Sequence, residues 1–157
     1  MQSRKHILFL NHKEKQCGVY QYGRRTAEIL KKSDNYNFIY CEVELEEEFL
    51  SLINNHNPIG VIYNYHPLTM VWIGKSVLDK FPNITHYGLH HEGSIVVAFD
   101  NNIIIDSTYT DNGNNYSVPR PLFEEIDNDV NSSVPVISSF GFGFGNNLRR
   151  RSFVRRP

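Results

Sequence analysis

The chain contains little cysteine: Cys17 and Cys41 are the only two among its 157 residues. Two cysteines do not make the framework of bridges that holds small secreted domains together, so we expect a reducing, cytoplasmic location. Long apolar runs are lacking as well. The run Ile7–Leu10 near the start is too short for a signal peptide or a membrane span, and we expect neither.

An excess of basic residues is lacking over most of the chain. The residues before Arg149 include eleven Lys and Arg and all seventeen Asp and Glu, which gives them a net charge of −6. Such a negatively charged domain is a poor partner for a phosphate backbone, so we expect it to bind no nucleic acid. The other five arginines lie in the last nine residues, and we expect residues 146–157 to form an Arg-rich tail.

Glycine-rich phosphate-binding motifs are also absent. Gly18 and Gly23 stand near the start of the first predicted helix, but neither the G-x-G-x-x-G nor the Walker A pattern occurs. No cofactor is therefore predicted. Two interpretations of Cys17 and Gly18 stay open: they bind a phosphate or a sugar, or they form a tight turn, with Gly23 packing the helix against the sheet.

What the sequence does contain is a regular alternation of strand and helix patterns. Strands are expected at residues 7–10, 37–43, 59–65 and 84–89, where short runs are rich in apolar residues. Apolar residues at helical spacing predict helices from Val19 to about residues 33–35, at 44–55 and at 69–80. This order predicts an α/β fold with a single Rossmann-like domain over residues 1–145, in which a mostly parallel sheet carries helices on both faces.

After Gly93 the helical patterns stop. Residues 103–105 and 134–140 predict two more strands, and residues 107–117 have the composition of a polar loop. In residues 140–145 phenylalanine alternates with glycine, so a strand there would place all three phenylalanines on one face.

Titratable side chains follow three of the predicted strands. His12 follows the first strand, His66 follows the third, and His90, His91 and Glu92 follow the fourth. In an open parallel sheet, ligands bind beyond the carboxyl ends of the strands, so we expect one crevice at this edge. The predicted substrate-binding residues are His12, Cys17, Gly18 and His66.

The cluster His90, His91 and Glu92 is the predicted catalytic group. Adjacent side chains at a strand end point to opposite faces, so only one of the two histidines should face the crevice. General acid–base chemistry would need a carboxylate to orient that ring, and Glu92 or Asp106 could serve. A hydrogen-bonded structural histidine is the alternative. A zinc site would need three or four converging ligands, and no metal is predicted.

Three further segments carry a resemblance to a known family. Residues 17–23 (CGVYQYG) open a helix after the first strand, residues 118–121 (VPRP) follow the predicted sheet, and residues 136–143 (VISSFGFG) form a late apolar run. Together with strands that end in histidines, this order resembles the N-terminal half of a GT-B glycosyltransferase, with residues 118–121 similar to its hinge segment. The resemblance covers residues 5–145.

The resemblance implies a division of labour. In such enzymes the first half supplies the acceptor side of the cleft, and the second half binds most of the nucleotide-sugar. We therefore expect a glycosyltransferase-like domain that binds a sugar or a sugar phosphate and that, without the second half, does not complete transfer alone. The alternatives are a stand-alone ligand-binding or regulatory module without catalysis, and a fragment that forms a homodimer.

Overall fold

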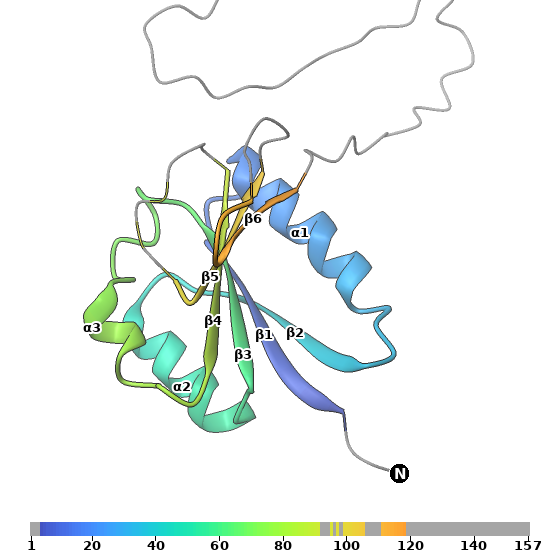
Figure 1. The fold of residues 1–157 in the computed structure, drawn as a ribbon, viewed down its shortest axis with the longest axis vertical. Coiled ribbons are helices and arrows are strands. Elements are labelled where there is room, and N and C mark those ends of the chain that lie inside the picture. The colour runs from blue at the N-terminus through green and yellow to red at the C-terminus, as the bar shows by residue number, and fades with distance from the viewer. Residues whose placement is uncertain (1–3, 92–94, 96, 98, 106–110, 119–157) are drawn as a thin grey trace, which may run out of the picture. The chain divides into compact units, whose positions relative to one another are not determined.

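A parallel sheet of six strands forms the centre of the part of the chain that the structure describes (Figure 1). The computed structural model describes residues 4–91, 95, 97, 99–105 and 111–118, all of which belong to one compact unit, residues 1–121. The strands are β1 (Lys5–Asn11), β2 (Tyr36–Glu42), β3 (Gly60–Tyr65), β4 (Thr85–His90), β5 (Asn101–Ile105) and β6 (Asn115–Val118). The helices are α1 (Gly18–Leu30), α2 (Glu46–His56) and α3 (Lys75–Leu78). The expected α/β, Rossmann-like fold with a parallel sheet is confirmed.

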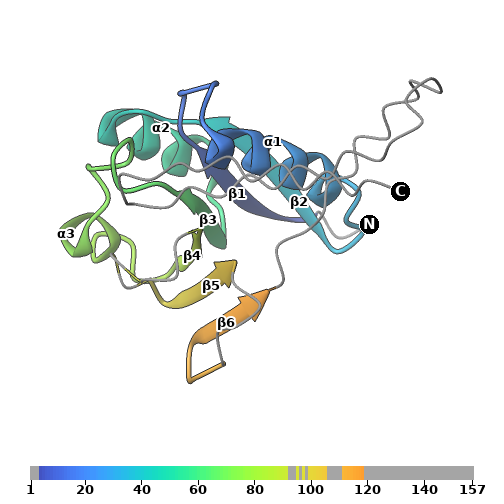
Figure 2. The same ribbon diagram turned by 90° about the horizontal axis from the view of Figure 1, so that it is seen from above.

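The strand order is β2-β1-β3-β4-β5-β6, and every pair of neighbours is parallel. Figure 2 shows β5 and β6 at the end of the sheet opposite β2. The chain runs outward from β1 to β2 and then returns past β1 to β3. This reversal makes the gap between the carboxyl ends of β1 and β3 a topological switch point, where open α/β sheets bind ligands.

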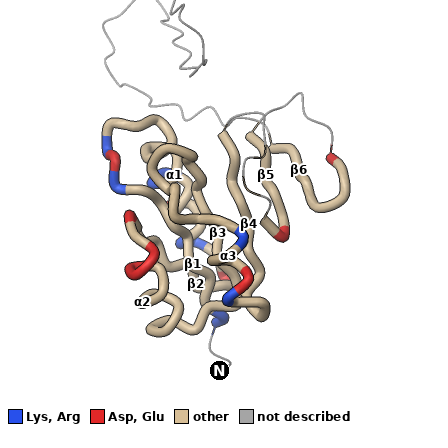
Figure 3. The backbone as a smooth tube through the Cα atoms, turned by 90° about the vertical axis from the view of Figure 1, so that its left-hand side faces the viewer, with Lys and Arg blue, Asp and Glu red and all other residues tan. Residues whose placement is uncertain are grey.

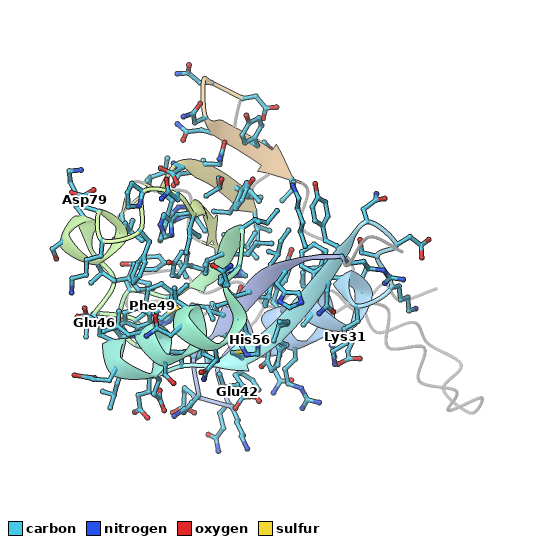
Figure 4. All side chains as sticks on the ribbon, turned by 90° about the horizontal axis from the view of Figure 1, so that it is seen from below. Lys31, Glu42, Glu46, Phe49, His56 and Asp79 are labelled. Carbon is cyan, nitrogen blue, oxygen red and sulfur yellow. The ribbon has the colours of Figure 1, made fainter. Side chains whose placement is uncertain are left out.

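Apolar side chains fill both faces of the sheet, as the near-continuous apolar strands predict. On one face α2 and α3 cover a core that includes Leu8, Val61 and Tyr63, and Phe49 of α2 is fully buried against it (Figure 4). On the other face, Ala27 of α1 packs with Phe9 and other residues of the strands. Helices thus lie on both sides of the sheet (Figure 1).

The third helix is much shorter than the sequence predicts. Instead of spanning residues 69–80, it covers only Lys75–Leu78. The amides of Thr69 and Met70 both donate to the carbonyl of His66, which forms a turn, and Gly74 has an extended backbone (φ −157°, ψ 174°) that a helix cannot pass through. Val71, an apolar residue within the expected helix, lies between this turn and Gly74 and is 78% exposed.

Strand β6 lies where the sequence predicts a polar loop, and β5 begins two residues earlier than expected. A hydrogen bond from Asn102 Nδ2 to Asn115 Oδ1 (3.0 Å) joins the two strands on their polar side. The strand expected at residues 134–140, the Phe-Gly alternation, the domain boundary at residue 145 and the Arg-rich tail lie outside the described residues. Among the residues described, no helix is long and apolar enough to cross a membrane.

Candidate functional site at the carboxyl edge of the sheet

The carboxyl ends of four neighbouring strands meet at one edge of the sheet. Register aligns Asn11 of β1 with Glu42 of β2, and Tyr65 of β3 with His90 of β4. The residues that follow β1 and β3, His12 and His66, therefore come to the same edge, and their rings lie 5.3 Å apart between centroids. The expectation that these strand exits share one edge is confirmed.

His12 is buried (1% exposed) at the switch point between β1 and β3. The backbone N–H of Glu14 donates to its Nδ1 at 3.1 Å, and its ring lies 5.9 Å from that of Tyr20 in the first turn of α1. Burial, with the nearby His66 in second place, lowers the pKa of His12 from 6.5 to about 4, although Glu14 and Glu42 oppose this shift.

The tautomer of His12 follows from these contacts. At neutral pH the ring is uncharged, and Nδ1 accepts a hydrogen bond, so the single proton is on Nε2. That Nε2 atom is buried and has no hydrogen-bond partner among the described residues. A buried donor left without an acceptor costs about 1–3 kcal/mol, so this atom calls for a partner.

The start of α1 lies beside His12. Cys17 is the N-cap residue and makes no side-chain capping hydrogen bond, and its thiol is free. Gly18, the first residue of the helix, is exposed. The N–H groups of the first turn and the positive end of the helix dipole favour an oxygen ligand at this point. His66, the other member of the His12–His66 pair, has its Nδ1 atom 3.3 Å from Thr69 Oγ1.

His90 and His91 have different surroundings, as expected of adjacent residues at a strand end. His90 is buried against Tyr65 and Phe99, its Nε2 lies 2.9 Å from Asn102 Oδ1, and burial lowers its pKa. His91 lies on the side of α1: its Nε2 is 2.7 Å from Asn64 Oδ1, and its ring contacts Tyr22 edge-on at 4.8 Å. His91 is thus the member of the pair on the same face as α1, and Glu92 and Asp106 lie outside the described residues.

Two buried asparagines at this edge were not singled out by the sequence. Asn11 and Asn64 are fully buried beneath α1, and their Nδ2 atoms donate to the carbonyls of Tyr20 (3.0 Å) and Val19 (2.7 Å). Gly23 makes this approach possible, because a Cβ there would collide with both amides. The signal was present in the sequence, since each asparagine interrupts the end of an apolar strand.

Glu42 also escaped the sequence-based prediction. It ends β2, and its Oε1 accepts hydrogen bonds from Tyr20 Oη (2.6 Å) and Tyr40 Oη (3.1 Å). Its hydrogen bond is the main reason that the pKa of Tyr20 is raised. The helix that follows β2 adds Glu46, Glu47 and Glu48 in its first turn, so negative charge gathers at the start of α2 (Figure 3).

Within the described part of the chain, no group of three or more His, Cys, Asp or Glu side chains could hold a metal ion. The chain matches no protein-family model and no curated protein sequence. The case for a function therefore depends on the geometry of this edge.

Proposed function

We propose that the chain is a ligand-binding α/β domain similar to the acceptor-side half of a GT-B glycosyltransferase. In this proposal a sugar or a sugar phosphate binds at the carboxyl edge between β1 and β3. His12, His66 and the Cys17–Gly18 start of α1 line the ligand, and His91 lies at the end of the next strand. The placement of these residues at a topological switch point supports the proposal.

The observation that carries the proposal is the unpartnered Nε2–H of His12. Its neutral, protonated-Nε2 form offers one directed donor, which an oxygen of the ligand would accept. Both a sugar hydroxyl and a phosphate oxygen have the required lone pairs. The N-terminal amides of α1, beside the same ring, supply further donors to the same ligand.

Transfer is not part of the proposed activity of the chain alone. Catalysis needs both reactants held in a reactive arrangement, and selective stabilisation of the transition state. In this proposal the described residues form only one side of such a cleft. We therefore expect binding of the ligand without measurable sugar transfer from a nucleotide-sugar, and steady turnover by the purified chain would contradict this expectation.

Binding can be tested by following backbone amide resonances while methyl α-glucoside or glucose 6-phosphate is added. We expect shifts at His12, Gly18 and His66 with at least one of these probes. His12→Phe should abolish them, whereas His12→Gln, which keeps a side-chain N–H donor, should retain weaker binding. His56→Gln is the matched control, because His56 ends α2 and its carbonyl contacts His6 near the start of β1.

Titration curves that are identical for the wild type and for His12→Phe would remove the main support for this site. Amide shifts that a sugar probe causes, and that an added nucleotide-sugar does not change, would fit the second candidate, a stand-alone binding module. The fully buried asparagine pair favours neither candidate, because it holds α1 in place in both.

A second copy of the chain is the macromolecular partner that we propose. Leu68 and Val71, in the segment between β3 and α3, are 71% and 78% exposed. The two residues stand three positions apart in the sequence, and contiguous exposed apolar patches mark interaction surfaces. The cytoplasmic location expected from the cysteine content stays a prediction.

A further inference from the structure

A chain of hydrogen bonds crosses the carboxyl ends of four neighbouring strands. It begins at His91, the residue after β4, and ends at Glu42, the last residue of β2. Its links are His91 Nε2 to Asn64 Oδ1 (2.7 Å), Asn64 Nδ2 to Asn11 Oδ1 (2.9 Å), Asn11 Nδ2 to Tyr40 Oη (3.1 Å) and Tyr40 Oη to Glu42 Oε1 (3.1 Å). The two central amides are fully buried beneath α1.

The backbone of α1 fixes the direction of every link. Each asparagine directs its Nδ2 at a helix carbonyl, Val19 for Asn64 and Tyr20 for Asn11, and a carbonyl can only accept. The Oδ1 of Asn64 must therefore face His91, so that His91 Nε2 is the donor. Tyr40 accepts from Asn11 and donates its own proton to the Glu42 carboxylate. All four hydrogen bonds point the same way.

The geometry points to Glu42 as the carboxylate that positions His91, acting through Tyr40, Asn11 and Asn64. The chain fixes the ring of His91 and places its proton on Nε2, which leaves the lone pair of the neutral ring on Nδ1. Hydrogen bonds in such a chain polarise one another, so the negative charge at Glu42 strengthens the Nε2–H bond of His91. Glu42 is a positioning residue, since it reaches the ring only through other side chains.

Glu42 was not among the carboxylates that the sequence suggested. Glu92 and Asp106, the carboxylates that the sequence suggested for this role, lie outside the described residues. The carboxylate that terminates this series of hydrogen bonds comes from β2, three strands away from β4. The role of His91 toward a bound ligand rests on the proposed function. Its tautomer and its dependence on Glu42 do not, and they can be measured in the unliganded protein.

The structure supplies a matched pair of variants. Tyr40 and Tyr20 both donate to Glu42 Oε1, but only Tyr40 also accepts from Asn11. Tyr40→Phe therefore cuts the chain, and Tyr20→Phe removes a hydrogen bond from the same carboxylate while leaving the chain complete. Glu42→Gln keeps the size of the side chain and removes its charge.

The experiment is ¹⁵N NMR of the imidazole rings in the full-length protein of 157 residues, with the resonances of His91 assigned. We expect the wild type to show the Nε2–H tautomer. Tyr40→Phe and Glu42→Gln should shift the Nε2–H proton upfield and speed its exchange with water, and Tyr20→Phe should leave both unchanged.

Two results would overturn the inference: an Nδ1–H tautomer in the wild type, or equal changes in Tyr20→Phe and Tyr40→Phe. The wild-type spectrum alone decides the first, even if a variant fails to fold. Failure of the proposed function would look different, because neither sugar probe would then shift any resonance while the His91 tautomer stayed as expected.

Discussion

At residue 23, α1 comes so close to the sheet that only glycine fits. A Cβ at this position would meet Asn64 Nδ2 and would lie 2.8 Å from Asn11 Nδ2. Alanine normally stabilises a helix by about 1 kcal/mol relative to glycine. Here we expect Gly23→Ala to lower the free energy of unfolding by about 1–3 kcal/mol, because the buried amides must move or lose hydrogen bonds. Urea denaturation measures the change.

Gly74→Ala is the control for this prediction. Gly74 is the N-cap residue of α3, and nothing lies within 4 Å of a Cβ added to it. We expect its stability to stay the same or to rise slightly, because alanine restricts the unfolded chain. If both variants behaved alike, the close approach of α1 at Gly23 would be wrong.

The buried ring of His12 makes stability depend on pH. Its pKa is 6.5 in an unfolded chain and about 4 in the fold, so between these values only the unfolded chain takes up a proton here. Stability from this residue is complete above pH 6.5 and is lost as the pH falls toward 4, by up to about 3 kcal/mol. Urea denaturation at pH 7 and pH 4.5 should therefore show a smaller loss for His12→Gln than for the wild type.

His86 and His90 also have pKa values lowered mainly by burial, so the variant should still lose some stability in acid. Equal losses in the wild type and in His12→Gln would show that His12 is not neutral in the fold.

At the scale of elements, one side chain holds the β5–β6 end of the sheet. Asn102 is buried, and it contacts His90 of β4, the backbone of Phe99 and Asn115 of β6. Asn102→Ala should leave several of these groups without partners, at a cost of about 1–3 kcal/mol. We expect amide hydrogen exchange to speed up in β5 and β6 while β1 and β3 stay protected.

Asn101→Ala is the control, because its side chain lies on the opposite face of the same strand. Uniform loss of protection in all strands of the Asn102 variant would mean that β5 and β6 do not open separately from the rest of the sheet.

Helices were predictable to the extent that local pattern decides them. The acidic first turn of α2 places this helix within two residues of the expected bounds. The apolar stripe of α1 places its start within one residue, but α1 ends at Leu30, three to five residues earlier than expected. For α3, the apolar pattern predicted a helix over residues 69–80. The turn after His66 and the extended backbone of Gly74 restrict the helix to Lys75–Leu78. Strand β6 has no periodic signal, because its pairing with β5 depends on a neighbour rather than on its own side chains.

At the scale of the whole molecule, strand exits predicted which edge carries the candidate site, because parallel strands end on the same side. The network that runs from His91 to Glu42 was not predictable in this way. It depends on the register of three strand pairs and on the distance between α1 and the sheet. Neither can be read from the presence of an asparagine or a glutamate in the sequence. The functional assignment of these residues stays a prediction.

We expect two copies of the chain to form a homodimer. We expect light scattering to give a mass of two chains, twice the 18.3 kDa of one. A specific dimer buries about 1,200–2,000 Å² in total, and the exposed Leu68 and Val71 offer an apolar contribution to such an interface. Ion pairs between the two copies are a poor alternative, because ion pairs between exposed side chains stabilise little.

Salt and substitution separate these two sources of affinity. At about 1 M NaCl the screening length falls to roughly 3 Å, so a dimer held by charge should dissociate, whereas one held by apolar contacts should keep its mass. We expect the second result. Replacing Leu68 and Val71 together by serine should then give the mass of one chain, and Ile29→Ser, which changes a 60% exposed residue of α1, should not. A single-chain mass for the wild type at high protein concentration and in any salt would contradict the dimer altogether.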